Sequence, residues 1–161
     1  MGSGRSGLYS GTHGSSAVPG SAYYMNPADN FSQYIKKRKD VDANGFYDVI
    51  AHGTTKTIQI QHNGETVLIS HRVAAKLFSR DSNFKGKGIR LLSCETGGIS
   101  RGFAQGLADK LNVVVLAPTK LVWARPDGSY FVAGKSKRNP NLPDMSDKGK
   151  FVKFYPGGAK K

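Results

Sequence analysis

The sequence contains few cysteine, histidine and acidic residues. Of its 161 residues, one is cysteine, four are histidine and 11 are acidic. A single thiol excludes an internal disulfide and cannot build a cysteine-based zinc site, so packing alone must hold the fold. No pair of histidine or cysteine residues falls at metal-ligand spacing. We therefore expect no metal.

The sequence also has no long apolar run. No segment approaches the roughly 18 consecutive apolar residues that span a bilayer. The amino terminus lacks the hydrophobic core of a secretory signal. We expect no membrane span, and if the protein is exported, something else must carry it.

Basic side chains, in contrast, are abundant. The chain has 24 lysines and arginines, a formal net charge of +13 and a pI of about 10.0. Such a charge favours polyanionic partners such as nucleic acid, inositol phosphates or acidic lipid. The alternative is a set of solvated loops and a basic tail. The two basic clusters are Lys36, Lys37, Arg38 and Lys39, and then Lys135, Lys137, Arg138, Lys148, Lys150, Lys153, Lys160 and Lys161 in the last 27 residues.

Length and composition indicate one domain, since 38% hydrophobic and 10% aromatic content suffice for a single core. Residues 1–22 are dominated by glycine and serine, and we expect a flexible linker that follows an upstream segment. Residues 23–45 are interpreted as a basic arm with at most a short helix. We assign the domain to residues 46–158 and a basic tail to residues 159–161.

The first half of this domain shows a strand followed by a hairpin and a helix. The strand covers residues 46–51, and alternating residues 56–61 and 66–69 flank Asn63-Gly64, whose turn positions both need a positive φ. Ser70 is suited to cap a helix over residues 71–79. In that helix, Val73, Ala74 and Leu77 form the expected apolar stripe.

The second half predicts a strand at residues 89–93, a helix at 100–111 and an apolar strand at 113–117. Strand, helix and strand in this order indicate a parallel sheet. A second hairpin is expected at residues 121–124 and 130–133, then a long basic loop at 134–149 and a last strand at 151–155. The fold class is thus α/β: a mostly parallel sheet flanked by helices, with a hairpin insertion and a C-terminal β extension.

A histidine and the cysteine follow two of these strands. His52-Gly53 follows the strand at residues 46–51, and Cys94 follows the strand at 89–93. If the strands are parallel neighbours, their carboxyl ends lie roughly 5 to 10 Å apart, which is where open α/β sheets place their chemistry. His52 is then the expected base for Cys94, and the amides of Gly53 and Cys94 form an oxyanion hole. The alternative is a buried apolar cysteine and a turn histidine.

Three further residues are candidates for supporting roles. Asp48 precedes His52 by four positions and is placed to orient the imidazole, unless solvation at the strand edge is its only role. Arg90 is a candidate contact for an acidic substrate group or a polyanion. Trp123 is interpreted as a cleft wall or core residue in preference to a stacking platform. Glu95 beside the thiol would raise the pKa of Cys94 and oppose its activation.

The order of His52-Gly53, hairpin, helix, strand ending in Cys94, helix and strand resembles the clan CD cysteine peptidases. That group includes caspases, CHAT peptidases and the self-processing domains of large bacterial toxins. The resemblance covers about residues 46–133 and implies a caspase-like fold with His52 as base and Cys94 as nucleophile. Cys94 follows His52 by 42 positions, a spacing within the caspase-like range. No substrate-specificity residue aligns.

The stretch from Leu91 to Gly97, together with Ala117-Pro118-Thr119, is similar to modules at the ends of Rhs-type and other polymorphic bacterial toxins. This resemblance implies an effector secreted within a larger toxin, with an upstream carrier and an immunity protein as partners. It would act on a protein in the target-cell cytoplasm. No cofactor is required, although the toxin relatives suggest inositol hexakisphosphate as an activator.

Two other functions remain open. A nucleic-acid-directed toxin or polyanion-binding module would use the charge without thiol chemistry. The sequence has no tandem aromatics on one strand to stack bases and no clustered carboxylates for Mg²⁺. A Cys-His deamidase or transferase would direct the same dyad at a glutamine side chain.

Overall fold

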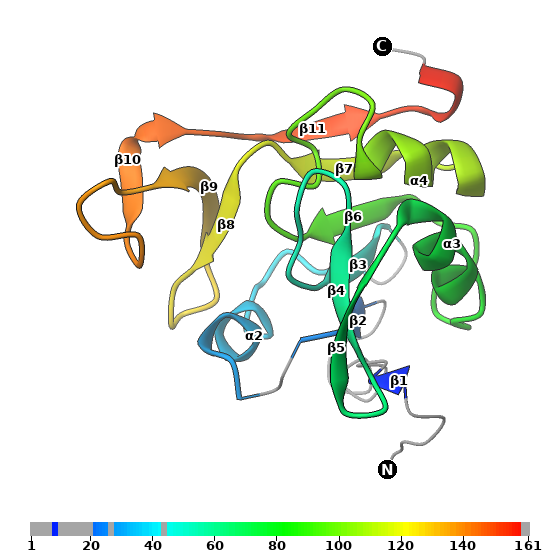
Figure 1. Cartoon of the computed structure of the whole chain (residues 1–161), viewed down its shortest axis with the longest axis horizontal. Helices are drawn as coiled ribbons and strands as arrows, with labels where there is room; N and C mark the ends of the chain where they lie inside the picture. The colour runs from blue at the N-terminus through cyan, green and yellow to red at the C-terminus, as the bar shows by residue number, and fades with distance from the viewer. Residues whose placement is uncertain (1–7, 10–20, 26–27, 43–44, 159–161) are drawn as a thin grey trace.

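The computed structural model describes residues 8–9, 21–25, 28–42 and 45–158, and its centre is a five-stranded sheet (Figure 1). The strand order is β11-β7-β6-β3-β2. Strands β2, β3, β6 and β7 run parallel, whereas β11 is antiparallel to β7. The predicted α/β class with a mostly parallel sheet is confirmed. The strands are β2 (Ser21–Tyr23), β3 (Tyr47–Ile50), β6 (Ile89–Leu92), β7 (Val115–Pro118) and β11 (Phe151–Phe154).

Helices α3 (His71–Ser79) and α4 (Phe103–Leu111) cover one face of this sheet (Figure 1). The main core lies between these helices and the sheet, because alternate strand residues such as Val49 and Leu91 pack with Phe78 and Phe103 in one buried cluster. The opposite face carries a smaller cluster in which Ile50 and Leu92 meet Ile35 of helix α2 (Asn30–Ile35). The sheet therefore has one helix-covered face and one face closed by shorter elements.

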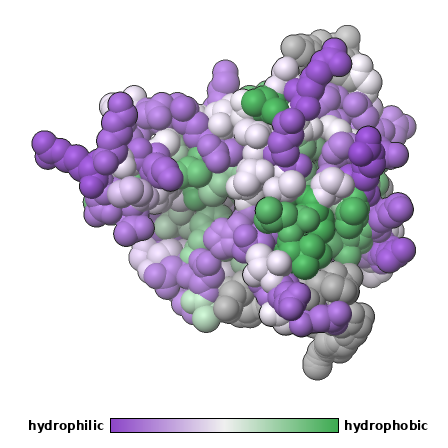
Figure 2. Space-filling model, in the orientation of Figure 1, coloured by the Kyte–Doolittle hydropathy of each residue, from purple (hydrophilic) through white to green (hydrophobic). Residues whose placement is uncertain are grey.

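The predicted helix at residues 71–79 has the same bounds in the structure. Ser70 caps it, with its side chain accepting a hydrogen bond from the Val73 amide at 3.4 Å. The predicted stripe is only partly correct, because Val73 is 49% exposed while Ala74, Ala75 and Phe78 are buried. Val73 and the exposed Leu68 contribute to the apolar patch that Figure 2 shows over α3 and the neighbouring hairpin.

That hairpin consists of β4 (Ile58–His62) and β5 (Glu65–Ile69). Its turn is the predicted one, with φ of 53° at Asn63 and 80° at Gly64. A short strand, β1 (Leu8–Tyr9), pairs antiparallel with β4. Thus residues 8–9 of the predicted linker pair with the hairpin, while most of residues 1–22 and all of the tail at 159–161 lie outside the described residues.

A separate three-stranded sheet follows β7, with the order β10-β9-β8. Its strands are β8 (Leu121–Ala124), β9 (Tyr130–Lys135) and β10 (Pro143–Lys148). The long loop predicted at residues 134–149 was wrong in part, because it contains β10. The sequence of β10 is polar and begins with proline, so it lacks the apolar alternation that predicts a strand. Its position at the edge of the sheet accounts for that composition.

The predicted start of the domain at residue 46 also needs correction. Ser21, Ala22 and Tyr23 form a buried edge strand that pairs parallel with β3. Helix α2 of the predicted basic arm packs on the same sheet through Ile35. The arm is thus part of the domain. Among the described residues, no helix is both long and apolar enough to cross a membrane.

Candidate functional site

His52 and Cys94 lie at the carboxyl ends of neighbouring parallel strands. Strands β3 and β6 pair in a register that places Ile50 opposite Leu92, and each candidate follows its paired residue by two positions. Adjacent strands are about 4.8 Å apart. Both strands end before the candidates, at Ile50 and Leu92, so each candidate lies in the turn that follows its strand. The predicted juxtaposition therefore exists at the level of the backbone.

The turns that carry the two residues are in direct contact. A Cβ atom placed on Gly53 would lie 2.9 Å from the carbonyl oxygen of Cys94 and 2.8 Å from Cγ2 of Thr96. Real Cβ atoms do not approach that closely, so this position requires glycine. The glycine after His52 therefore lets the histidine turn rest against the cysteine turn.

The thiol of Cys94 is largely buried beneath β8. Its sulfur accepts a hydrogen bond from the Val122 amide at 3.4 Å. Burial raises the pKa of Cys94 above its ordinary value, and Glu95 raises it further, while the amide hydrogen bonds of Val122 and of Cys94 itself lower it. Burial outweighs the hydrogen bonds, and the thiol is protonated at neutral pH in this structure.

The imidazole of His52 is about half exposed and contacts a carboxylate. Its Nε2 lies 3.1 Å from Oδ2 of Asp29. Asp29 caps α2, and its other carboxylate oxygen accepts a hydrogen bond from the Phe31 amide at 3.0 Å. Within the described residues no hydrogen bond joins His52 to Cys94. Sequence reasoning missed Asp29, although an aspartate just before a predicted helix is a standard N-cap signal.

The amides around the two turns have mostly found partners. Glu95 donates to the Lys120 carbonyl at 2.9 Å, Gly97 donates to the Pro118 carbonyl at 2.8 Å, and Thr54 donates to the Thr57 carbonyl at 2.9 Å. In the part of the chain that the structure describes, the amides of Gly53 and Cys94 donate to no carbonyl or side-chain oxygen. These are the two amides that were predicted to hold an oxyanion.

Asp48 does not orient His52, contrary to one of its predicted roles. Its carboxylate is buried and is held by two arginines, Arg38 and Arg90. Arg38 Nη2 lies 2.8 Å from Oδ2, and Arg90 Nε lies 2.8 Å from Oδ1. The parity argument placed Asp48 on the correct face, but burial drives the carboxylate to the nearest cations. Strand-edge solvation, its other predicted role, is wrong for the same reason.

Arg90 is used within the fold and does not face solvent as a free cation. Its guanidinium also contacts Asp40 at 3.0 Å and the Tyr130 hydroxyl at 2.9 Å. Burial alone would raise the pKa of Asp40, but the Tyr130 hydroxyl and the charge of Arg90 outweigh it and lower that pKa. The network joins β3, β6, β9 and the segment after α2.

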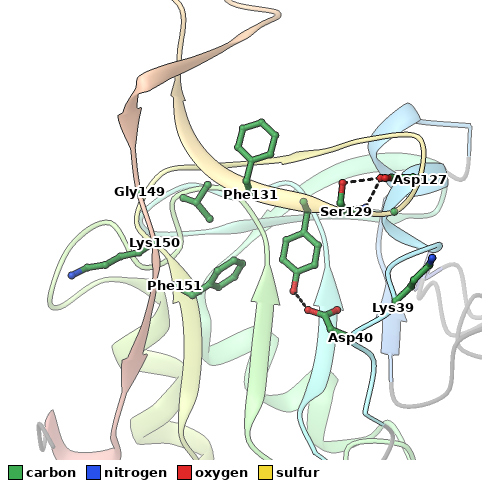
Figure 3. A pocket seen from close by; sticks show the side chains of 11 residues that line it. Lys39, Asp40, Asp127, Ser129, Phe131, Gly149, Lys150 and Phe151 are labelled. Atoms are coloured by element: carbon green, nitrogen blue, oxygen red, sulfur yellow. Dashed lines mark hydrogen bonds between the residues drawn. The ribbon is translucent and has the colours of Figure 1, made fainter.

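An open cavity of about 690 Å³ adjoins Tyr130 and Asp40. The Tyr130 hydroxyl donates a hydrogen bond to Asp40, and in Figure 3 the ring of the next residue, Phe131, points away from Asp40. Neither His52 nor Cys94 lines this cavity. It is lined by Lys39, Asp40, Asp127, Gly128, Ser129, Tyr130, Phe131, Val132, Gly149, Lys150 and Phe151.

Trp123 lies on β8, next to the residue whose amide contacts the thiol. It is partly exposed, and its indole Nε1 donates to the Ala133 carbonyl at 2.9 Å. It therefore lies across the β8–β9 hairpin. Among the described residues, no group of three or more histidine, cysteine, aspartate or glutamate side chains is arranged to hold a metal ion.

These features define an α/β protein with a histidine and a cysteine at the carboxyl edge of its parallel sheet. Residues 21–132 match the family model described as a domain of unknown function, DUF8616, and the chain belongs to that family. The match begins at β2 and includes both His52 and Cys94. No curated protein and no solved structure matches the chain.

Proposed function

We propose that this domain is a cysteine peptidase of the clan CD type, in which Cys94 is the nucleophile and His52 the general base. The observation that carries the proposal is the register of β3 and β6, because His52 and Cys94 each follow a paired strand residue by two positions at the same edge of the sheet. The contact of Gly53 with the Cys94 carbonyl supports it, because it joins the two turns.

The reaction is acyl transfer. As Cys94 Sγ bonds to the substrate carbonyl carbon, the thiol proton passes to the imidazole of His52. The negative charge on the substrate oxygen then faces the amides of Gly53 and Cys94, which have no other oxygen acceptor in the described structure. The C–N bond breaks as the imidazole returns its proton to the leaving amine. Water, deprotonated by His52, finally cleaves the thioester and restores the thiol.

Asp29 has a positioning role in this proposal. Its carboxylate lies 3.1 Å from His52 Nε2 and therefore favours a proton on that nitrogen. The other ring nitrogen is left as the acceptor. A carboxylate beside the base also stabilises the imidazolium that forms when the thiol proton is transferred.

The resting thiol is not yet a nucleophile. Its burial raises the pKa of Cys94, and the Val122 amide holds the sulfur beneath β8. Substrate must therefore displace this contact before His52 removes the proton. Apo structures of enzymes often have long or missing catalytic hydrogen bonds that form only with substrate.

The biological setting belongs to the same proposal: an effector domain of a larger secreted toxin, neutralised by an immunity protein and acting on a protein in the target-cell cytoplasm. Expression in a target cell tests it. Wild-type protein should arrest growth, and Cys94→Ala or His52→Ala should abolish the arrest while His71→Ala, a control on α3, keeps it. Folded Cys94→Ala and His52→Ala variants with full toxicity would rule the proposal out.

Product analysis separates peptide cleavage from the deamidase alternative. Peptidase activity generates new protein amino termini in cells expressing the wild type, and these should be missing with Cys94→Ala. A deamidase would instead convert glutamine to glutamate, adding about 1 Da and no new terminus. Inositol hexakisphosphate is proposed as an activator that binds the exposed lysines of the C-terminal strands, and it should raise the thermal stability of the domain at low salt. If the thermal stability does not change, inositol hexakisphosphate is ruled out as an activator.

A further inference from the structure

The outward face of the β8–β9 hairpin carries an aromatic pair. In the antiparallel register Trp123 pairs with Phe131, and Val122 pairs with Val132. The two valines are buried against the rest of the molecule. Because paired residues share a face and successive residues alternate, Trp123 and Phe131 are together on the other, partly exposed face. Two aromatics are thus brought together on one face across two strands.

A cation adjoins this aromatic pair. The Arg125 guanidinium carbon lies 4.4 Å from the centre of the Phe131 ring, within cation–π range. Arg125 is exposed and follows Trp123 by two residues, so it shares the same face. The indole is fixed in place by its hydrogen bond to the Ala133 carbonyl at 2.9 Å. One anchored indole, a second ring and a stacked arginine therefore share this face.

Exposed lysines lie on the strand that carries Phe131 and at the end of the neighbouring strand β10. Lys135 follows Phe131 by four residues along β9, while Lys148 and Lys150 lie at the end of β10 and just beyond it. Lys120 is ion-paired with Asp147 at 3.1 Å, whereas the other three lysines form no salt bridge within the described part of the chain. Hydrophilic side chains project from β9 and β10 on the left of Figure 2.

The hairpin loop carries the carboxylate of Asp127, whose pKa is lowered by the Ser129 hydrogen bonds and by the charge of Arg125, so it offsets part of the positive charge beside the rings. Asp127 is turned into the β8–β9 loop, where it accepts hydrogen bonds from the Ser129 amide at 2.9 Å and hydroxyl at 2.7 Å. The net charge of +13 leaves the protein as a whole strongly attractive to polyanions.

We propose that the face formed by Trp123, Arg125 and Phe131 binds single-stranded nucleic acid. Unpaired bases stack on aromatic rings and on arginine planes, and the exposed lysines contact phosphates. A duplex hides its base faces, so it would use the lysines without the rings.

Trp123 allows a direct test because it is the only tryptophan in the chain. Titration of the whole protein with single-stranded oligonucleotides of twelve thymidines or twelve uridines should quench its fluorescence, as a base stacks on the indole. Phe131→Ala should weaken binding by about tenfold, a loss in the range of one base stack, whereas Phe131→Tyr, which keeps the ring, should bind like the wild type.

The controls separate stacking from charge. Arg125→Ala should weaken binding more than Arg72→Ala, which removes an equal charge from exposed α3 on the other face of the main sheet. Inorganic polyphosphate and duplex DNA of equal length should bind more weakly and leave the fluorescence unchanged. Equal losses of affinity in Arg125→Ala and Arg72→Ala would overturn the proposal. So would binding that leaves Trp123 fluorescence unchanged and is not weakened by Phe131→Ala. Cys94→Ala should bind normally, so the result is independent of the peptidase.

Discussion

Arg38 and Asp48 form a buried ion pair, with Nη2 of the arginine 2.8 Å from Oδ2 of the aspartate and almost no exposure of either side chain. Arg90 shares the same carboxylate at 2.6 Å. The pair ties the segment after α2 to strand β3. Arg38 also donates to the Ser21 hydroxyl at 2.7 Å, which anchors β2. The charged cluster therefore holds the amino-terminal part of the domain on the sheet.

Asp48→Asn should strongly destabilise the protein. The substitution leaves two arginines near a neutral amide in a buried position, and breaking a buried ion pair typically costs about 3 to 5 kcal/mol. Urea unfolding followed by circular dichroism measures the loss. Asp144→Asn is a matched control, since the carboxylate of Asp144 on β10 accepts its hydrogen bonds from neighbouring Ser146, and the substitution should change stability by less than about 0.5 kcal/mol. Equally small losses of stability in Asp48→Asn and Asp144→Asn would show that the buried charged cluster does not stabilise the fold.

Gly53→Ala should displace the histidine turn from the cysteine turn. Its methyl group would overlap the Cys94 carbonyl oxygen, so we expect a loss of about 1 to 3 kcal/mol and a change in the alkylation rate of Cys94. Gly64→Ala introduces strain at a positive φ but has no atom within 4 Å of the new methyl. It should cost about 1 kcal/mol and leave Cys94 reactivity unchanged. The reverse pattern would contradict the contact between the turns.

The buried thiol predicts a specific dependence of stability on pH. Because burial raises the pKa of Cys94, the folded protein keeps this proton at pH values where the unfolded thiol, which titrates near pH 8.5, has lost it. The stabilisation that comes from this protonated thiol is complete below that pH and is lost as pH rises. Relative to Cys94→Ala, wild-type stability should fall by at most about 1.4 kcal/mol per pH unit above pH 8.5. A stability difference between wild type and Cys94→Ala that does not change with pH would show that folding does not shift the pKa of Cys94.

Much of the sheet was predictable because its local signals agree with its final environment. The Asn63-Gly64 turn needs positive φ whatever its surroundings, and Ser70 marks the start of α3. Strand β10 was not predictable, because Pro143–Lys148 is polar and becomes a strand through its pairing with β9. Ser21–Tyr23 was missed for a similar reason. It follows a glycine and serine tract, and only its position beside β3 makes it a strand.

The site was predictable in its backbone and less so in its side chains. Strand order and parity place His52 and Cys94 at one edge, because parallel strands end together. The partner of His52 is Asp29, which lies on another element and is brought near only by the packing of α2. The roles of Asp48 and Arg90 depend on Arg38 and Asp40 in the same way. A single-strand pattern contains no information on such tertiary partners.

The most direct test of the central claim is the rate at which Cys94 is covalently labelled. A pool of peptidyl acyloxymethyl ketones, compared with iodoacetamide, can be followed by intact-protein mass spectrometry at pH 7 in wild type, His52→Ala and His71→Ala. The account predicts slow labelling by iodoacetamide, because the resting thiol is protonated. Peptidyl reagents should label wild type and His71→Ala at least about tenfold faster, and His52→Ala should lose that advantage. Equal slow rates for both reagents, or undiminished labelling in folded His52→Ala, would contradict the assignment of a Cys94–His52 dyad.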